Sequence, residues 1–321
     1  MRAWQGNTGG GNIGQRGLIM LFNVFGLRPL YAVLAFVVPF YMLFARKGYL
    51  AIYHYFRQHF GYSEWKSFWK TYQNHFLFGQ IILDRFAVFA GRKNAFEVEI
   101  IGFEHFEQLS NEKKGFIMAG AHVGNFEIVG YLLNSKMKRV NALIYAGETA
   151  EMQKNRSKIL NNNNINLIPV LNDMSHFFAI NAALQNGEIV SMPCDRNHGS
   201  AKSVECDFLN GKADFPVGAF ALAASFEVEV LAIFAIKISA KKYKVFVVPV
   251  VHELHESSRK KCPQITQINT EKISVNSCNS WTKKEKIANL AKSYAKELEN
   301  IVKQYPEQWF NFYEFWKSSK L

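Results

Sequence analysis

The stretch FIMAGAHVGNFEIVGYLL, residues 116–133, combines the two patterns that decide the fold. Its first six residues, 116–121, are apolar or small, which is typical of a strand buried on both faces. From residue 122 to 134 the apolar positions recur at helical spacing, which predicts a helix. A buried strand that leads directly into a helix is the repeating unit of α/β proteins.

The same alternation continues on both sides of this stretch. Strands are predicted at 97–102, 140–146, 166–170, 188–195, 228–236 and 244–251, and helices at 103–109, 176–185, 218–226 and 283–304. Residues 255–282 are polar and nearly without apolar positions, which predicts a long loop. We therefore expect an α/β domain over residues 93–321, built on a mainly parallel mixed sheet flanked by helices.

The N-terminal quarter of the chain has a different pattern of residues, without the alternation of strands and helices. Residues 1–17 are rich in glycine and predict a flexible tail. Residues 18–45 are mostly apolar but are interrupted by Arg28 and Pro39, and the clean apolar part, residues 29–45, is close to the roughly 17-residue lower limit for a membrane-spanning helix. A tilted span, an interfacial anchor and a buried core helix are all compatible with this pattern. Residues 49–90 predict two amphipathic helices separated at 61–63, so that 18–92 forms a hydrophobic helical anchor with amphipathic helices.

Composition narrows the class of partner. The 321 residues carry a formal net charge of +12, which favours anionic partners such as lipid head groups or phosphate-bearing donors. Because no compact Lys/Arg stripe is interleaved with aromatic residues, nucleic acid is not an expected partner. The four cysteines show no CxxC spacing and indicate free thiols. In VVHELHE (250–256) the two histidines are three residues apart, whereas the zinc-protease pattern needs four, so we predict no metal site.

The residue that follows the predicted strand 116–121 is a histidine, and reactive groups in open α/β sheets gather at the carboxyl ends of strands. On an ideal helix five residues advance about 500°, so His122 and Glu127 meet only if His122 precedes the first regular turn. Gly120 and Gly124 permit such an irregular backbone. A neutral imidazole can take a proton from an alcohol, and a carboxylate on its other ring nitrogen fixes the tautomer. Because no Ser or Cys stands beside His122, we expect the acceptor itself to attack, without an acyl-enzyme.

The segment GAHVGNFE (120–127) resembles the His-x4-Asp/Glu motif of the lysophospholipid acyltransferase superfamily, and more closely that of the bacterial lipid A late-acyltransferases, the lauroyl/myristoyl acyltransferase family. The resemblance also covers the N-terminal anchor, the segment 194–218 and the ending YPEQWF (305–310). The tail departs from the lipid A enzymes, because it continues as NFYEFW instead of a Trp-x-His-Arg-Arg-like run. In this respect the chain is more similar to relatives associated with aryl polyene and flexirubin pigments.

This resemblance implies a reaction, a cellular location and roles for several residues. The expected reaction is transfer of a fatty acyl chain from acyl carrier protein (acyl-ACP) or coenzyme A (acyl-CoA) to a lipid acceptor, as in lipid A biosynthesis. It is expected at the cytoplasmic face of the bacterial inner membrane, without a bound cofactor or metal. His122 would be the general base and Glu127 the carboxylate that orients it, while backbone amides or Arg196 would stabilise the oxyanion.

Five further residues are candidate substrate contacts: Asn125, Asp195, Arg196, Gly218 and Arg156. Asp195 and Arg196 would contact the acceptor or the phosphate of the donor's phosphopantetheine arm, since Arg suits bidentate phosphate binding. Gly218 would open a helix whose terminal amides hold a phosphate. The alternatives are a local salt-bridged turn for 195–196, a tight strand–helix turn at Gly218 and a solvated surface position for Arg156.

Three other functions are rivals to this one. An enzyme with the same mechanism could acylate an aryl polyene or flexirubin pigment, or another membrane lipid. A non-catalytic lipid-binding membrane protein would have the same anchor, but the intact His122 and Glu127 argue against it. A nucleic-acid-binding protein would rest on net charge alone.

Overall fold

The protein was analysed as a computed structural model. It describes residues 17, 20–21, 24–89, 95–132, 138–145, 164–171, 175–197, 202–251 and 282–316. Most of the predicted N-terminal tail at 1–17 and of the predicted loop at 255–282 lies outside these residues. Most of the segment VVHELHE (250–256) also lies outside them. Within them, no group of three or more His, Cys, Asp or Glu side chains could hold a metal ion.

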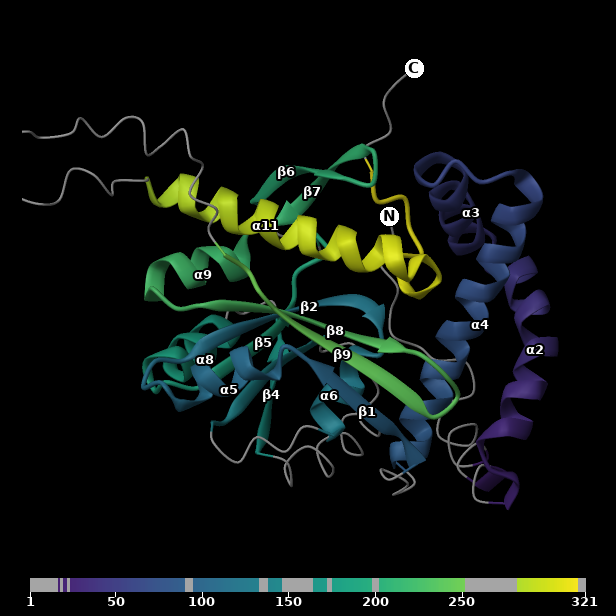
Figure 1. Cartoon of the computed structure of the whole chain (residues 1–321), viewed down its shortest axis with the longest axis horizontal. Coiled ribbons are helices and arrows are strands. Elements are labelled where there is room, and N and C mark those ends of the chain that lie inside the picture. Colours follow the sequence, from purple (N-terminus) through teal and green to yellow (C-terminus); the bar gives the residue numbers. More distant parts are fainter. Residues whose placement is uncertain are drawn as a thin grey trace, which may run out of the picture.

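A seven-stranded sheet forms the centre of the described structure, in the order β1-β9-β8-β2-β5-β3-β4 (Figure 1). Its strands are β1 (Glu97–Ile101), β2 (Phe116–Gly124), β3 (Val140–Tyr145), β4 (Ile165–Val170), β5 (Ile189–Pro193), β8 (Val230–Lys237) and β9 (Lys242–Pro249). The five strands β8, β2, β5, β3 and β4 run parallel, whereas β9 is antiparallel to β8, and β1 runs with β9. The predicted mainly parallel mixed sheet is therefore confirmed.

Helices flank both faces of this sheet, as expected. They are α5 (Phe103–Asn111), α6 (Phe126–Leu132), α8 (Ser175–Gln185), α9 (Gly218–Phe226) and α11 (Lys283–Gln304). A separate hairpin of β6 (Ser203–Phe208) and β7 (Gly211–Pro216) lies beside α11, near the top of Figure 1. Helix α11 begins with a capping box, in which Thr282 and Glu285 bond each other's backbone N–H groups.

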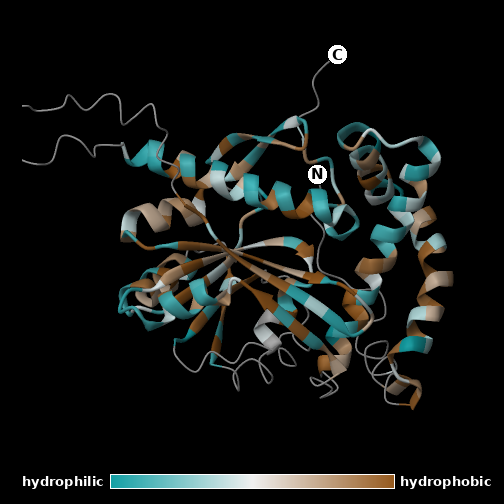
Figure 2. Cartoon of the chain, in the orientation of Figure 1, coloured by the Kyte–Doolittle hydropathy of each residue, from teal (hydrophilic) through white to brown (hydrophobic). Residues whose placement is uncertain are grey.

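The N-terminal part forms a layer of helices beside the sheet. Its elements are α2 (Leu27–Phe44), α3 (Arg46–His54), the π-helix η1 (Tyr55–His59) and α4 (Glu64–Phe89). The break before α4 falls at the predicted position, 61–63. Figure 2 shows α2 as a largely apolar helix alongside α4. Among the described helices, α2 is long and apolar enough to cross a membrane by length and composition.

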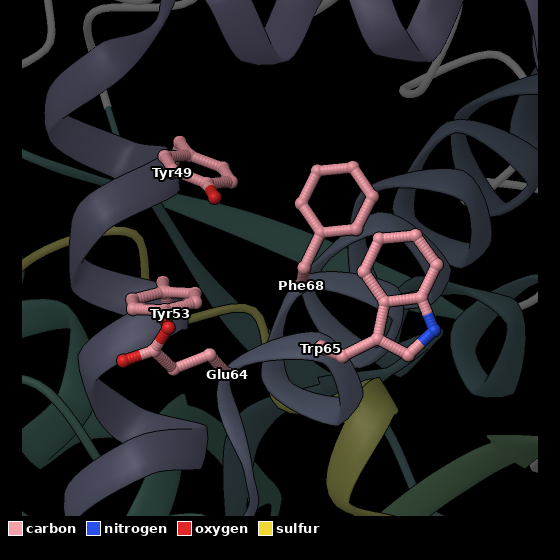
Figure 3. A pocket seen from close by; sticks show the side chains of 5 residues that line it. All are labelled: Tyr49, Tyr53, Glu64, Trp65 and Phe68. Carbon is pink, nitrogen blue, oxygen red and sulfur yellow. The ribbon is translucent and has the colours of Figure 1, made fainter.

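A shallow groove lies between α3 and the start of α4 (Figure 3). It has a volume of about 430 Å³ and is lined by Tyr49, Tyr53, Glu64, Trp65 and Phe68. The groove is therefore aromatic, with one carboxylate among its lining residues.

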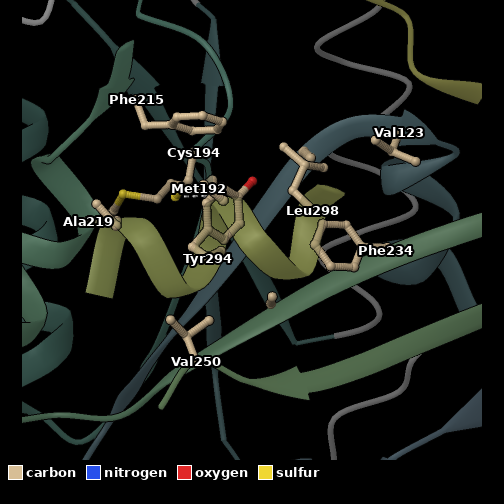
Figure 4. Packing of buried hydrophobic residues seen from close by; sticks show 14 of the residues in the cluster. Val123, Met192, Cys194, Phe215, Ala219, Phe234, Val250, Tyr294 and Leu298 are labelled. Carbon is tan, nitrogen blue, oxygen red and sulfur yellow. Dashed lines mark hydrogen bonds between the residues drawn. The ribbon is translucent and has the colours of Figure 1, made fainter. Parts of the chain in front are cut away.

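The core consists of two apolar layers separated by the sheet. On β2, Ile117 and Ala119 face the layer formed with α8, α9 and α11, while Phe116 and Met118 face the layer formed with α4 and α5. Figure 4 shows Tyr294 of α11 in the first layer, and its hydroxyl donates to the carbonyl oxygen of Gly120 at 2.6 Å. The alternation along β2 explains why both faces of this strand are apolar.

The boundary between β2 and α6 differs from the prediction. The strand does not end at Ala121 but continues to Gly124, and the helix begins at Phe126 instead of His122. The register of β2 on β8 shifts between Gly120 and Gly124. Gly124 has a φ of +58°, and a Cβ there would lie 2.0 Å from the carbonyl oxygen of Ala235. Gly124 thus allows an irregular extended backbone at residues 122–124, so that His122 lies in the strand and not in the helix.

Candidate active site

The carboxyl ends of β2 and β5 bring together two residues that are far apart in the sequence. The two strands are parallel neighbours, with Gly120 aligned with Pro193. The register continues for one more step, because the Cys194 N–H donates to the Gly120 carbonyl at 2.9 Å. His122 and Asp195 therefore leave the sheet at the same edge, where parallel strands present their functional groups.

His122 is held by both oxygens of the Asp195 carboxylate. Its Nδ1 lies 2.8 Å from Oδ1, and its backbone N–H donates to Oδ2 at 2.9 Å. Asp195 is fully buried, while the His122 side chain is 23% exposed. Burial alone would raise the pKa of Asp195, but the opposite charge and the hydrogen bonds of His122, with the charge of Arg196, hold this pKa below its ordinary value.

A charged carboxylate on Nδ1 requires a hydrogen on that nitrogen, which leaves the lone pair of neutral His122 on Nε2. Among the described residues, none hydrogen-bonds to Nε2. Phe126 lies edge-on to the imidazole with ring centroids 5.6 Å apart, and it is 46% exposed. The arrangement can therefore accept a proton from a hydroxyl group that approaches beside an apolar ring.

The C-terminal tail completes this site. Its Trp309 forms a β-bridge with Val123, and the Phe310 N–H donates to the His122 carbonyl at 2.9 Å. The indole N–H of Trp309 also donates to Asp195 Oδ2 at 3.3 Å. Sequence reasoning attributed no role to Trp309; the only signal was the resemblance of YPEQWF to the family's tail.

Gln308 attaches the same tail to the end of β8. Its amide accepts a hydrogen bond from the Lys237 N–H at 2.9 Å and donates to the Lys237 carbonyl at 2.8 Å. Gln308 is buried, so these two bonds satisfy an amide that would otherwise be destabilising. The tail is thus an integral part of the sheet edge that carries His122.

Glu127 does not occupy the position that was expected for it. It lies in the first turn of α6 and forms an ion pair with Arg85 of α4 at 2.8 Å. The carboxylate on Nδ1 of His122 is that of Asp195. The physical reason is the extended backbone at 122–124, which places the imidazole over β5, whereas Glu127 belongs to the helix that packs on α4.

Asn125 has a structural explanation. It is 3% exposed, and its Oδ1 accepts the Ile128 N–H at 3.2 Å, which caps α6. Its Nδ2 donates to the hydroxyl of Tyr243 at 3.3 Å. These contacts account for the asparagine without a substrate.

Arg196 follows Asp195 and is held against the tail. It donates to the Phe310 carbonyl, and its guanidinium lies 5.8 Å from the ring centroid of Tyr313. Its Nε is buried and has no partner among the described residues. Arg196 therefore supplies fixed positive charge beside Asp195 and retains a donor for a further group.

The last two candidates are Gly218 and Arg156, and neither is among the described residues that contact His122. Gly218 is the first residue of α9, and a Cβ there would meet no atom within 4 Å. A glycine is therefore not required there by steric crowding. Arg156 lies outside the described residues.

A buried polar cluster lies behind α6. The ammonium of Lys237 and the hydroxyls of Tyr31 and Tyr243 all contact the carboxylate of Asp84. The side chains of Asp84 and Lys237 are 0% and 2% exposed. Because Tyr243 also accepts from Asn125, the cluster connects α2 and α4 to the helix cap next to His122.

Comparison with known proteins places these features in a family. A model of the family described as bacterial lipid A biosynthesis acyltransferase matches residues 72–318, which is more than half of the chain. The matched region contains His122, Glu127, Asp195 and the C-terminal tail. No curated protein matches the chain.

Proposed function

Because this chain belongs to the bacterial lipid A biosynthesis acyltransferase family, we propose that it transfers a fatty acyl chain from a thioester donor to a hydroxyl group of a membrane lipid. The family is one of acyltransferases, which implies a thioester donor and a lipid acceptor in general. The observation that carries the proposal is the pairing of His122 with the buried carboxylate of Asp195, with Nε2 left for the acceptor.

In the proposed reaction, Nε2 of His122 removes the proton of the acceptor hydroxyl while its oxygen attacks the thioester carbonyl. The tetrahedral intermediate collapses by breaking the carbon–sulfur bond, and the imidazolium returns its proton to the departing thiolate. Asp195 retains the Nδ1 hydrogen and stabilises the imidazolium while it exists. The products are an ester and a free thiol, and the enzyme returns to its starting protonation state.

The thiol of Cys194, which precedes Asp195 in the chain, does not suit a covalent route. Cys194 is 2% exposed, and burial raises the pKa of its thiol far above the ordinary range. Its Sγ donates toward the Met192 carbonyl. A protonated, buried thiol is a poor nucleophile, so direct attack by the acceptor is the simpler pathway.

We assign Glu127 a positioning role through Arg85. The pair joins the first turn of α6 to α4, and both side chains are largely buried, at 11% and 17% exposure. It would keep the strand–helix junction in place as the acceptor enters beside Phe126. Arg196, with its remaining buried N–H, is the candidate to bind the oxyanion or a phosphate of either substrate.

The donor, the acceptor and the location are finer parts of the proposal. Acyl-ACP and acyl-CoA both carry a phosphopantetheine phosphate, which the basic chain would attract. A lipid A precursor is the first acceptor to test. An aryl polyene or flexirubin pigment is the second, because the C-terminal sequence differs from that of the lipid A enzymes. The exposed apolar helix α2 supports a membrane location, which we place at the cytoplasmic face of the inner membrane.

The test compares the lipids of the native host with and without the gene by mass spectrometry. Deletion is expected to remove one acyl chain from one lipid class, and the wild-type gene is expected to restore it. His122→Ala should fail to restore it, while His105→Ala, which changes a histidine of α5, should restore it fully. Full restoration by His122→Ala would exclude this active site; an unchanged lipid profile in the deletion strain would exclude membrane lipids as acceptors.

A further inference from the structure

The outer face of α2 is an uninterrupted apolar surface. Its exposed side chains recur at helical spacing, and their exposed fractions lie between 51% and 87%; they are Val33, Phe36, Val37, Phe40, Tyr41, Leu43 and Phe44. No charged residue occurs between Arg28 and Arg46. A row of large apolar side chains of this length is unfavourable in water and marks a contact surface.

The opposite face of α2 packs on α4 along most of its length. Tyr31 near the start of α2 donates to Asp84, and Tyr41, at the border between the two faces near the end of α2, lies 6.0 Å from the ring of His75. Between them, Leu34 packs so closely on Gly79 that a Cβ there would lie 2.7 Å from its methyl groups. The two helices are thus antiparallel and in contact from end to end, as Figure 1 shows.

This docking restricts how α2 can meet a bilayer. Its 18 residues are about 27 Å long at 1.5 Å per residue, close to the thickness of a hydrocarbon core. If α2 crossed the bilayer while docked, the part of α4 beside it would be drawn into the hydrocarbon with its exposed Gln73, and so would the C-terminal tail, whose Trp309 carbonyl accepts from Asn74 of α4. If α2 undocked instead, Tyr31 would leave the buried carboxylate of Asp84. Each alternative is destabilising, because polar groups would lose water or partners.

The start of α4 extends the apolar surface with aromatic rings. Trp65 and Trp69 are 69% and 46% exposed and contact each other edge to face at 5.8 Å. Trp69 in turn contacts Tyr72, whose hydroxyl donates to the Ala35 carbonyl of α2. The aromatic stripe therefore leads directly to α2. Amphipathic rings of this kind concentrate at the level of lipid head groups.

Charge complements this surface. Arg46 and Lys47 follow α2 and are exposed, and neither α2 nor α3 contains an acidic residue. The aromatic groove of Figure 3 lies at the same end of α2, between α3 and α4. Exposed basic side chains beside an apolar face are attracted to anionic phospholipids.

We propose that α2 does not span the bilayer but lies in the plane of its surface, docked on α4. Its outer face is sunk about 5–10 Å into an anionic phospholipid leaflet, and Trp65 and Trp69 lie at head-group depth. The occupant of this surface is a lipid leaflet, on the same side of the membrane as the active site. The inference deepens the membrane location within the proposed function but does not depend on which acceptor is acylated.

Depth measurements along α2 distinguish the two orientations. The full-length protein, with Cys262 and Cys278 changed to Ser, receives one nitroxide at a time at Val33→Cys, Phe36→Cys, Phe40→Cys or Phe44→Cys. Accessibility to oxygen and to a nickel chelate is measured in phosphatidylethanolamine/phosphatidylglycerol vesicles. The in-plane helix gives similar depths at all four positions. A steady change in depth from Val33 to Phe44 would indicate a spanning helix and overturn the proposal, as would nitroxides that remain in water.

Vesicle flotation with matched variants tests the surface itself. Phe36→Glu and Phe40→Glu are each expected to weaken binding to these vesicles about tenfold, since each places a charge where a phenyl ring was buried in lipid. Phe178→Glu is the control, because Phe178 of α8 is 77% exposed and Phe36 is 76% exposed. Equal binding by all three variants would contradict the proposal. Acyl transfer to an acceptor in detergent micelles is measured alongside, so that failure of membrane docking is distinguished from failure of the proposed chemistry.

Discussion

Nδ1 of His122 lies 2.8 Å from Oδ1 of Asp195, although 73 residues separate them in the chain. The contact exists because β2 and β5 are parallel neighbours whose pairing ends at Gly120 and Pro193, each two residues before one of the two partners. The same carboxylate accepts the backbone N–H of His122 and the indole N–H of Trp309. One buried carboxylate thus fixes the tautomer of the imidazole, the strand end that carries it and the tail that covers it.

Replacing this carboxylate should remove most of the activity. Asp195→Asn presents an amide to Nδ1 and destabilises both the required tautomer and the imidazolium, so kcat/KM should fall by about 10³-fold or more. Steady-state kinetics with a purified thioester donor measure this, with circular dichroism as a check on folding. Asp207→Asn is the control, since Asp207 is an exposed residue of β6 paired with Lys212. A loss of less than about tenfold would mean that Asp195 does not orient the base.

The ion pair between Glu127 and Arg85 leads to a prediction about the activity of variants that lack one or both partners. If Glu127 acts by holding α6 on α4, then Glu127→Gln and Arg85→Met should lower kcat by similar factors, and the double variant should be little worse than either single one. Comparison of kcat and KM for the three variants provides the measurement. A much larger loss for Glu127→Gln than for Arg85→Met would show that the carboxylate acts directly on His122 or the substrate.

The low pKa of Asp195 predicts how stability depends on pH. Because the folded-state pKa lies below the unfolded value of roughly 4, this group adds stability that is fully present above that value. The contribution is lost as the pH falls through the folded-state pKa. Urea unfolding of the wild type and Asp195→Asn should therefore show a difference at pH 7 that shrinks in strongly acidic buffer. A difference that grows with acid would contradict the assignment.

Asp84 and Lys237 form a buried pair that should be sensitive to the loss of one member. Lys237→Met leaves the Asp84 carboxylate buried without its cation, which should destabilise the protein by about 3 kcal/mol. Adding Asp84→Leu should recover part of this loss, because no unpaired charge then remains buried. Thermal unfolding of the single and double variants tests both statements. Additive losses would mean that the two groups do not act as a pair.

Two glycines offer a matched comparison. Gly124→Ala forces a Cβ toward the Ala235 carbonyl at a positive φ, so it should destabilise the fold by at least about 1 kcal/mol and reduce activity. Gly218→Ala should leave the free energy of unfolding unchanged, since open space surrounds that position. A rise in KM for the donor in Gly218→Ala, without a change in stability, would support phosphate binding at the start of α9. Equal stability of both variants would contradict the close approach of the Ala235 carbonyl to Gly124.

The local patterns were sufficient for most elements of the fold. Alternating apolar strands and helices predicted the sheet, the break at 61–63 separated α3 from α4, and α11 was predicted with its observed bounds. The predicted junction after Ala121 was wrong, because residues 122–124 have a helix-compatible pattern but belong to the strand. Pairing of β2 with β8 across a register shift determines that junction, and a single segment does not contain this information.

The same distinction applies to the site. The sequence by itself made His122 the candidate base, because a strand that ends in small residues before a reactive side chain is a local pattern, and the family resemblance made Asp195 a candidate substrate contact. It did not determine that Asp195, instead of Glu127, binds Nδ1, nor that Trp309 shares this carboxylate. Only the tertiary structure decided these contacts, because strand order in a parallel sheet is set by long crossover connections and by packing against α4 and α11. Local sequence fixes which groups are available, whereas the sheet fixes which of them meet.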